Sequence, residues 1–373
     1  MSGSRWRSIP CKVTDLRLDI TLLCGQSFRW KEKQPGLWSG VLKGKVWTLK
    51  QTQDELLYQV CEREKTDLHS RKRSSTDAEI CKSKRAKLQY GLYTNIATDE
   101  KVTKNEISDN SLIHDNILKD YFHLNVDLQD LYQKWSAVDD NFKAVAANFT
   151  GIRLLKQDPV ENLFSFICSS NNNITRISGM VERMCQKYGE KICEVEGLPY
   201  YSFPSVSALA SKQTEQQLRE LGFGYRAKYI SQAAMHIMEN YNENWLASLR
   251  DVSYKEAHVQ LMKLAGVGAK VADCVCLMSL NKYNAIPVDT HVWQIATRDY
   301  MKSLRKTKSL TDKVYKQVGD FFRELYGEYA GWAHSVLFSA ELRKFQDLKK
   351  EPNSRPLLPI ECGKTIKKEV TTT

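Results

Sequence analysis

The 373-residue sequence lacks the long apolar run of a membrane protein, since no stretch approaches the roughly 18 apolar residues of a spanning helix. Its first ten residues, MSGSRWRSIP, lack the apolar centre of a secretory signal, so we expect no transfer to an oxidising compartment. Ten cysteines are present without a CxxC pair, and we expect reduced thiols. Only Cys362 lies near the C-terminus, which excludes a zinc or four-cysteine iron–sulfur site there. We expect no metal and no cofactor.

The chain carries an excess of positive charge. Lysine and arginine total 55 against 44 acidic residues, a formal net charge of +11. Such an excess favours an anionic partner, most commonly nucleic acid. A membrane surface is the weaker choice, and we expect no membrane partner. A basic soluble protein without an anionic partner is the alternative, and charge alone does not exclude it.

The N-terminal part predicts an antiparallel β-meander over residues 13–60. Residues 13–20, VTDLRLDI, alternate apolar and polar side chains with the period of a half-buried strand. Further strands are expected at SFRW, LWSGVL and KVWTLKQ, separated by the turn-forming segments KEKQPG and KGK.

A polar, charged segment over 62–111 predicts a disordered insertion. Within it, residues 71–87, RKRSSTDAEICKSKRAK, hold two basic clusters suited to a bipartite nuclear-import signal. A solvated linker is the equal alternative. We therefore predict a nuclear location, with a mitochondrial fraction left open.

From Asp115 onward the pattern is helical almost throughout. The expected fold class is α+β, with an N-terminal antiparallel β domain followed by an all-helical body. The expected boundaries are 1–61 with 112–150 for the N-terminal domain, 151–345 for the body, and 346–373 for a disordered tail. One expected helix runs through LQDLYQKWSAVDDNFKAVAANF, and residues 302–313 form a basic connection.

The segment LMKLAGVGAKVADCVCLMSL reads as helix, short hairpin, helix. Gly266 and Gly268 permit the positive φ values that such a hairpin requires, and they leave backbone N–H groups uncovered. Together with the start of the second helix, these groups form a cradle for an anion such as a DNA phosphate. L-x-G-V-G-x-K-x-A is the helix–hairpin–helix pattern; an ordinary helix-to-helix turn is the alternative.

Lys270 lies at the start of the second helix, where the helix dipole disfavours an ammonium ion. Cys274 and Met278 follow on the same face and remove water from it. A neutral amine is a nucleophile, so this lysine is a candidate for covalent chemistry. A plain phosphate contact is the alternative.

Asp289 precedes THVWQIATRDY at the N-cap position of a further helix. The helix over 270–280 is roughly 16 Å long, and residues 281–288 can reach back about 26 Å. Asp289 can therefore lie beside Lys270, although a plain cap is the alternative. An amine with a carboxylate that stabilises an oxocarbenium-like centre suits cleavage of an N-glycosidic bond.

The hairpin, Lys270 and the P-V-D sequence ending at Asp289 resemble the helix–hairpin–helix/Gly-Pro-Asp superfamily of DNA base-excision glycosylases. Within it the chain resembles the eukaryotic 8-oxoguanine DNA glycosylase/AP lyases, over about 13–62 and 112–345. The resemblance rests on six blocks, GQSFRW, DPVENLFSFICSSNNNITRISGMVERMCQ, LGFGYRAKYI, GVGAKVADCVCLMSL, PVDTHVW and YAGWAHSVLFSAEL.

The resemblance implies excision of 8-oxoguanine opposite cytosine from double-stranded DNA by a monomer. Lys270 would form a Schiff base, and Asp289 would be its electrostatic partner. The Gly25 carbonyl would accept the N7–H that normal guanine lacks. The flipped base would lie between Cys274 and Phe338, beside Met278. Cys274 and Phe338 are also ordinary core residue types.

Further residues would contact the DNA around the lesion. Asn171, Arg176 and Arg226 would donate to the cytosine left behind by flipping, and Tyr225 would fill the vacated stack. His291 would meet a phosphate. By themselves these residue types are weak signals, because asparagine runs usually mark loops.

The sequence departs from the family at His334, where glutamine is usual and reads the purine's Watson–Crick edge. A neutral imidazole places its donor and its acceptor on separate atoms, so it cannot copy an amide. Glu341 stands where aspartate is common, a milder change.

Two other readings stay open at this level. One is a glycosylase for a different damaged base, of the endonuclease III type, which usually has four C-terminal cysteines. The other is a non-catalytic helix–hairpin–helix module, which needs neither Lys270 nor Asp289. The strength of the lyase step, the excision of formamidopyrimidines and the role of the insertion are not fixed by the sequence.

Overall fold

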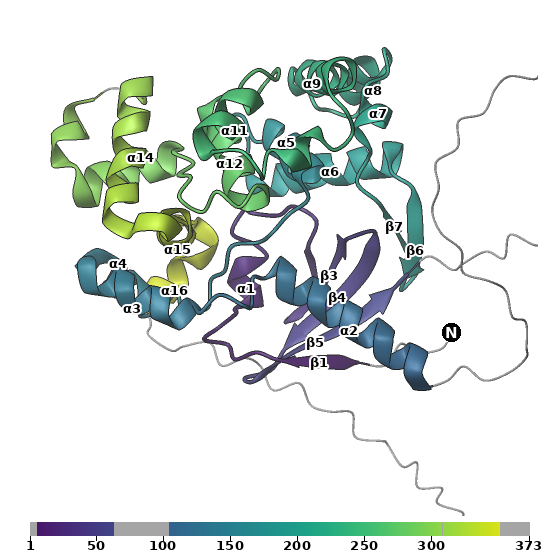
Figure 1. The fold of residues 1–373 in the computed structure, drawn as a ribbon, viewed down its shortest axis with the longest axis horizontal. Coiled ribbons are helices and arrows are strands. Elements are labelled where there is room, and N and C mark those ends of the chain that lie inside the picture. The colour runs from purple at the N-terminus through teal and green to yellow at the C-terminus, as the bar shows by residue number, and fades with distance from the viewer. Residues whose placement is uncertain (1–5, 63–103, 308, 351–373) are drawn as a thin grey trace, which may run out of the picture.

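The computed structural model describes residues 6–62, 104–307 and 309–350, and it has an N-terminal sheet beside a larger helical body (Figure 1). The predicted α+β class is confirmed. The sheet is antiparallel with strand order β1-β5-β4-β3-β2. Its strands are β1 Arg7–Pro10, β2 Lys31–Gln34, β3 Leu37–Leu42, β4 Lys45–Gln51 and β5 Glu55–Cys61.

Two predicted strands are wrong. Residues 13–20 form a turn that leads into the short helix α1, Leu18–Thr21, and SFRW precedes β2 without belonging to it. The alternation misled because this segment lies between two cores: Leu18 packs in the core of the sheet, whereas Ile20 packs in that of the helical body. Apolar residues therefore recur at every second position because they are buried in two different cores, although the backbone is not extended.

Helix α2, Lys104–Tyr121, lies across the sheet (Figure 1). It is held there by hydrogen bonds from Tyr58 Oη to Asp115 Oδ1 at 2.6 Å and from Trp30 Nε1 to Tyr121 Oη at 2.9 Å. Its start corrects the insertion expected over 62–111, since residues 104–111 are helical. The expected nuclear-import signal lies outside the described residues.

The helical body contains most of the predicted helices. Its longer helices are α3 Leu128–Val138, α4 Asp140–Ala146, α5 Pro159–Ile167, α6 Ile174–Tyr188, α8 Thr214–Glu220, α9 Arg226–Asn240, α11 Tyr254–Leu261, α12 Ala269–Ser279, α13 Thr290–Ile295, α14 Asp312–Tyr326 and α15 Ala330–Glu341. Short helices add α7 Val206–Leu209, α10 Trp245–Ser248, α16 Gln346–Lys350, the π-helix Ala296–Tyr300 and three 3₁₀ segments, Lys302–Lys306, Gly327–Tyr329 and Arg343–Phe345.

Three local features depart from expectation. The helix expected over 128–149 is two helices, because Asp139 has an extended backbone and caps α4 through Asn141 N. A hairpin of β6 Lys191–Val195 and β7 Leu198–Tyr201 interrupts the helical region, with Glu196 and Gly197 at φ +52° and +76°. The tail expected to be disordered from residue 346 begins instead with α16.

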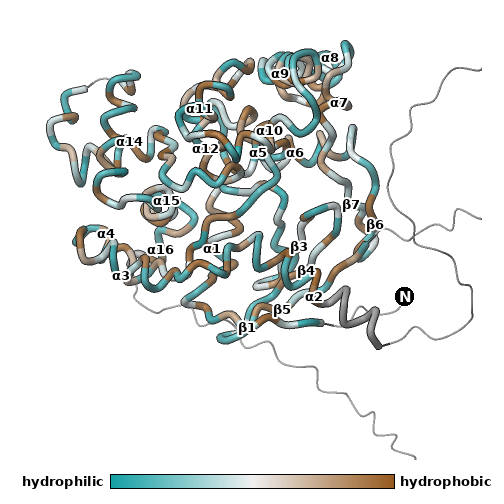
Figure 2. The backbone as a smooth tube through the Cα atoms, viewed as in Figure 1, coloured by the Kyte–Doolittle hydropathy of each residue, from teal (hydrophilic) through white to brown (hydrophobic). Residues whose placement is uncertain are grey.

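The core of the helical body is centred on α12, every residue of which from Val271 to Ser279 is buried. This helix packs along α5 on one side and against α11 on another. Brown and teal alternate along most of the other helices in Figure 2, as expected where one face is buried. Among the described residues, no helix combines the length and apolarity needed to cross a bilayer.

Candidate active site

The hairpin between α11 and α12 depends on its first glycine. Gly266 has φ +77°, and a Cβ atom there would lie 2.6 Å from Cβ of Tyr229, so both backbone and space require glycine. The expected positive φ is wrong at Gly268, whose backbone is extended with φ −93° and ψ −178°. Gly268 is the N-cap of α12, has no capping side chain, and would present an added Cβ to open space. The backbone N–H groups at the start of α12 are therefore uncovered, as predicted.

Lys270 extends from the first turn of α12 toward the end of α5. Its Nζ atom lies 3.4 Å from Oγ of Ser169 and 4.8 Å from the ring centroid of Phe166. The Ser169 hydroxyl donates to the Phe166 carbonyl at 2.7 Å, so a lone pair of the hydroxyl remains for the lysine. A neutral acceptor and a ring face hold the amine here.

Asp289 is the N-cap of α13, as predicted. Its Oδ1 accepts from His291 N at 2.9 Å and from Val292 N at 3.0 Å. These two bonds leave Oδ2 available to a second partner. The carboxylate is thus fixed by the start of a helix while part of it faces outward.

The side chains of Lys270 and Asp289 line one cavity of about 60 Å³. The structure brings seven of the predicted site residues together here, including both candidates for the chemistry. The lining residues are Cys24, Gly25, Gln26, Phe166, Lys270, Cys274, Met278, Pro287, Asp289, His334, Ser335 and Phe338.

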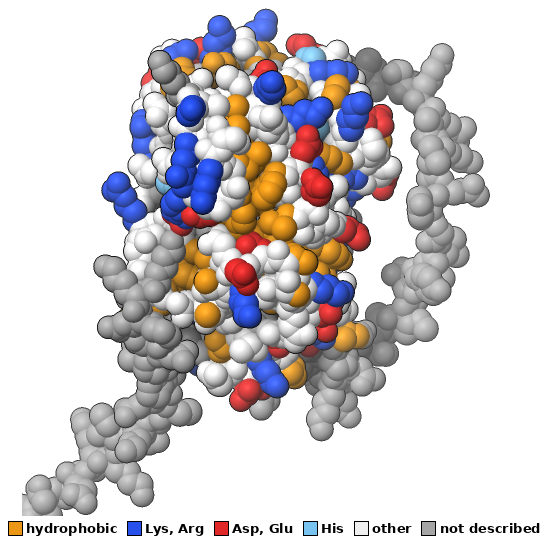
Figure 3. Space-filling model, turned by 90° about the vertical axis from the view of Figure 1, so that its left-hand side faces the viewer, with side chains coloured by type: hydrophobic (Ala, Val, Ile, Leu, Met, Phe, Trp, Pro, Cys, Tyr) orange, Lys and Arg blue, Asp and Glu red, His pale blue; other side chains and the backbone are white. Residues whose placement is uncertain are grey.

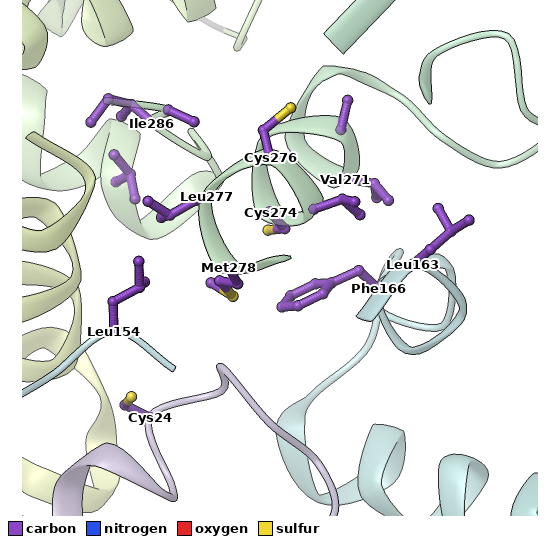
Figure 4. Close-up of a cluster of buried hydrophobic side chains, with 14 of the residues drawn as sticks. Cys24, Leu154, Leu163, Phe166, Val271, Cys274, Cys276, Leu277, Met278 and Ile286 are labelled. Carbon is purple, nitrogen blue, oxygen red and sulfur yellow. The ribbon is translucent and has the colours of Figure 1, made fainter. Parts of the chain in front are cut away.

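One wall of the cavity is apolar and comes from α12 and α5. Cys274 and Met278 lie on α12 near Phe166 of α5, with Cys24 on a separate loop (Figure 4). Burial raises the pKa of the Cys274 thiol to about 11, against the opposing effect of nearby Lys270. The sulfur is therefore an uncharged, polarisable surface at neutral pH.

Another part of the lining comes from α15, where His334 and Phe338 lie one turn apart. Their ring centroids are 6.3 Å apart and their planes differ by 26°. His334 is buried, and neither of its ring nitrogens has a hydrogen-bond partner among the described residues. Burial lowers the pKa of His334 to about 4, so the ring is neutral at pH 7 and offers one donor and one acceptor. Buried polar groups normally have partners; here the Gly331 backbone, one turn earlier on α15, acts on the ring without forming a direct hydrogen bond.

The loop that carries Gly25 closes the cavity from the N-terminal part of the chain. Gly25 has φ +83°, a backbone conformation that favours glycine. Its neighbour Gln26 fixes the loop through Nε2 to Arg153 O at 2.9 Å and through Oε1, which accepts from Leu155 N at 2.9 Å. Gln157 Nε2 donates to Gln26 O at 2.7 Å. This anchoring holds Gly25 against the helical body.

Three of the residues expected to contact DNA lie together at the ends of α5 and α9. Asn171 is exposed with φ +45°, and Tyr225 is 45% exposed. Arg226 is buried, and its guanidinium donates to the carbonyls of Ser170 and Asn171, the latter at 3.0 Å. Its guanidinium carbon lies 4.6 Å from the Tyr225 ring centroid. In this structure Arg226 holds the loop that presents Asn171.

Arg176 and His291 have contacts of their own. Arg176 is exposed in the first turn of α6, where its backbone N–H is capped by Asn173 Oδ1 at 2.9 Å. The His291 ring lies edge-on to Phe338, with centroids 6.0 Å apart. On the face drawn in Figure 3, apolar side chains form a central strip; Lys and Arg side chains gather above it and to its left, and acidic side chains also lie along it.

Comparison with known proteins decides the family. The family described as 8-oxoguanine DNA glycosylase, N-terminal domain, matches residues 8–163, and the HhH-GPD superfamily of base excision DNA repair proteins matches residues 164–319. N-glycosylase/DNA lyase OGG1 of Arabidopsis thaliana is 35% identical over 340 residues, which is 91% of this chain and 80% of that protein. This chain belongs to the 8-oxoguanine DNA glycosylase family.

Two further relatives agree with the assignment. The N-glycosylase/DNA lyase of Saccharomyces cerevisiae is 43% identical over 249 residues, 60% of this chain and 66% of that protein. The solved 8-oxoguanine glycosylase/lyase of Clostridium acetobutylicum, in complex with double-stranded DNA containing cytosine opposite 8-oxoG, has a TM-score of 0.67 at 27% identity, covering 93% of this chain and 99% of that one.

Some residues of this family member's cavity were missed by sequence reasoning. Phe166 lies in an apolar helix and Ser169 in a polar run, so each resembles an ordinary residue of its segment. Gln26 stands within the GQSFRW block, but nothing local shows that its amide reaches the backbone of Arg153 and Leu155. Only the fold places these side chains beside Lys270 and Gly25.

Proposed function

We propose that Lys270 is the nucleophile and Asp289 its electrostatic partner in base excision by this enzyme. Membership of the family makes the chain a bifunctional DNA N-glycosylase and AP lyase for 8-oxoguanine in base-excision repair. The observation that carries the residue assignment is that an amine and a carboxylate, each at the first turn of a helix, line one cavity.

The chemistry follows from the two groups. As the bond from C1′ to the base breaks, positive charge grows on the sugar, and the Asp289 carboxylate stabilises it. The Lys270 nitrogen bonds to C1′, the base leaves with the bonding electron pair, and the nitrogen gives up its protons as the ring opens to an imine. Loss of a C2′ proton then expels the 3′-phosphate and cuts the strand.

Recognition of the base is assigned to the walls of the cavity. Cys274 and Met278 supply one apolar face, and Phe338 supplies an aromatic face for the other. The Gly25 carbonyl accepts N7–H of the oxidised base, whereas the N7 lone pair of guanine would be repelled there. His334 meets the Watson–Crick edge with its ring nitrogens, most directly as an acceptor for N1–H or N2–H.

DNA is the partner, in agreement with the DNA complex of the Clostridium relative. We assign the phosphate cradle to the hairpin at Gly266 and Gly268, where backbone N–H groups are uncovered. His291 is assigned to a phosphate near the lesion. Asn171, Arg176 and Arg226 are assigned to the cytosine opposite the lesion and Tyr225 to the vacated stack. The hydrogen bonds from Arg226 to the carbonyls of Ser170 and Asn171 hold this loop in place, which supports a preformed contact surface for that cytosine.

The cellular context is also proposed. We assign the enzyme to the nucleus as a monomer, on the basic segment 71–87 and on its eukaryotic relatives. Fusing residues 62–111 to a fluorescent protein too large to enter passively tests the signal. If the fusion stays in the cytoplasm, the basic clusters are part of a solvated linker and not an import signal.

The competing function is a DNA-binding module without catalysis. Borohydride reduces an imine to a stable amine, so an enzyme of the proposed kind becomes covalently bound to lesion DNA and a binding module does not. We expect wild-type trapping on duplexes with 8-oxoguanine, strongest opposite cytosine among the four bases. Lys270→Gln should bind the duplex but should not become trapped on it or nick it. Lys263→Gln, which changes an exposed lysine near the same hairpin, should still become trapped and still nick the duplex. Normal turnover by Lys270→Gln would refute the assignment.

A further inference from the structure

One phenolic hydroxyl joins the two segments that carry the proposed catalytic pair. Tyr315 of α14 donates through Oη to Oδ2 of Asp273. The same oxygen accepts from the backbone N–H of Val288 at 3.4 Å. Asp273 lies three residues after Lys270 on α12, and Val288 immediately precedes Asp289. A single oxygen atom thus connects the helix of the amine to the loop of the carboxylate.

The partners of this hydroxyl are buried, which makes the connection costly to lose. Asp273 and Val288 are each 1% exposed. Burial raises the pKa of Asp273, while hydrogen bonds from the two tyrosines and nearby His258 and Arg323 favour its charged form. A buried carboxylate or N–H group that loses its partner keeps the full cost of leaving water. Each of these two groups therefore restrains the position of the hydroxyl and, through it, of the other segment.

The second tyrosine on Asp273 has a different role. Tyr254 of α11 donates to Asp273 Oδ1 at 2.6 Å, and His258 Nε2 lies 3.6 Å from the same oxygen. Both residues belong to α11, which precedes the hairpin, and no hydrogen bond of theirs in the described part of the chain reaches residues 286–289. Tyr254 therefore braces α12 from the other side without touching the Asp289 loop.

We propose that Tyr315 is a positioning residue for base excision, because its hydroxyl fixes the loop of Asp289 relative to the helix of Lys270. The proposal rests on the assigned roles of those two residues. Pro287 has no N–H, so the Val288 N–H is the donor closest before Asp289 that can bind a neighbouring element. The carboxylate of Asp289 accepts from the first N–H groups of its own helix. Farther back, the connection is tied to α12 by Lys282 N, which donates to Cys276 O at 3.0 Å, and to α15 by Gly331 N, which donates to Tyr283 O at 2.8 Å. Tyr315 therefore adds a restraint at the end of the connection next to Asp289.

Positioning of this kind is expected to act on rate and not on DNA affinity. Misplacement of a reacting group by about 1 Å can cost roughly a hundredfold in rate. Tyr315 lies outside the cavity lining and is not among the groups assigned to DNA. Removing its hydroxyl should therefore lower the single-turnover rate while the affinity for the lesion duplex stays the same.

The test compares Tyr315→Phe with Tyr254→Phe in the full chain. Each variant removes one hydroxyl from the same carboxylate, but only the first also frees the Val288 N–H. We expect Tyr315→Phe to slow single-turnover excision of 8-oxoguanine by about tenfold or more and borohydride trapping in parallel, with the duplex dissociation constant within about twofold. Tyr254→Phe should stay within about threefold of wild type. Equal losses in the two variants, or none in Tyr315→Phe, would overturn the proposal.

Amide hydrogen exchange gives a readout that does not depend on the variants folding. In the wild-type chain the Val288 amide should exchange slowly although it lies outside a helix or strand, because it is buried and bonded to Tyr315. Rapid exchange there would contradict the contact. Loss of trapping by the wild type would instead count against the function of Lys270, so the two failures are distinguishable.

Discussion

Lys270 and Asp289 occupy the first turn of α12 and the N-cap of α13, and their side chains line the same cavity. Two helix starts therefore converge on one point, where each contributes uncovered backbone N–H groups or a fixed carboxylate. Such a point favours negative charge on the ligand, as phosphate carries, beside a carboxylate that favours positive charge on the sugar. Glycosidic cleavage within DNA requires both effects, because the substrate has a negatively charged backbone and its sugar becomes positively charged as the bond breaks.

Replacing Asp289 with asparagine separates its two roles. Asparagine caps a helix nearly as well as aspartate, so the melting temperature should change little, whereas loss of the charge should slow single-turnover excision by about a hundredfold. Asp158 is the matched control, because it caps α5 in the same way, with Oδ1 accepting from Val160 N and Glu161 N at 2.9 and 3.1 Å. Asp158→Asn should leave the rate intact. Equal rates for Asp289→Asn and wild type would leave only a capping role for Asp289.

The histidine in the cavity makes a prediction about selectivity. His334→Gln places a donor and an acceptor side by side on one amide, so we expect selectivity for 8-oxoguanine over guanine to be preserved or to rise by roughly fivefold, the effect of one hydrogen bond near 1 kcal/mol. Excision rates on matched duplexes measure it. Ser335→Ala is the control, because that hydroxyl donates to Gly331 O within its own helix. A collapse of activity in His334→Gln would show that the imidazole has a function an amide cannot supply.

Stability at acid pH should also depend on His334. Burial lowers the pKa of this histidine from 6.5 to about 4, so between these values the unfolded chain binds a proton that the folded chain does not. The free energy of unfolding should therefore fall as pH drops from about 6.5 to 4, by up to about 3 kcal/mol from this residue. Denaturant unfolding of wild type and His334→Gln at pH 7 and pH 4.5 tests it. The free energy of unfolding should fall more between pH 7 and pH 4.5 for wild type than for His334→Gln. Equal losses in the two proteins would show that the imidazole is in contact with water in the folded state.

The two hairpin glycines should fail for different reasons when replaced by alanine. Gly266→Ala forces a left-handed backbone and a 2.6 Å approach to Tyr229, so it should destabilise the fold by about 1–2 kcal/mol or more. Gly268→Ala meets neither obstacle and should melt like wild type, but its methyl group adds bulk in the open space beside the proposed phosphate cradle and should weaken duplex binding. Thermal melting and a binding titration separate the two. Normal DNA affinity in Gly268→Ala would show that the DNA phosphate is bound at another place in the protein.

Local chemistry made much of the site predictable from the sequence. The cap at Asp289, the hairpin at Gly266 and the position of Lys270 follow from short-range rules for helix ends and turns, and the structure has all three. The predicted strands LWSGVL and KVWTLKQ are β3 and β4 for the same reason. The resemblance to the family then supplied residues that composition alone leaves ambiguous, such as Gly25 and Phe338.

What the sequence did not show depends on contacts between distant segments. The hydroxyl of Tyr315 reaches Asp273 across 42 positions, and Gln26 reaches Arg153 across 127. The β6–β7 hairpin turns at Glu196 and Gly197, a weaker signal than the Asn-Gly or Asp-Gly pairs that mark such turns. Residues 13–20 alternated because two cores flank them. Each miss is a tertiary effect on a locally ambiguous segment.

The location of the covalent bond to DNA tests the catalytic assignment most directly. The wild-type enzyme is incubated with a duplex carrying 8-oxoguanine opposite cytosine, reduced with borohydride, digested with a protease and analysed by mass spectrometry. We expect the reduced sugar remnant on Lys270 and on no other lysine. A remnant on a different lysine, or on the N-terminal amine, with Lys270 unmodified would contradict the assignment of Lys270 as the nucleophile.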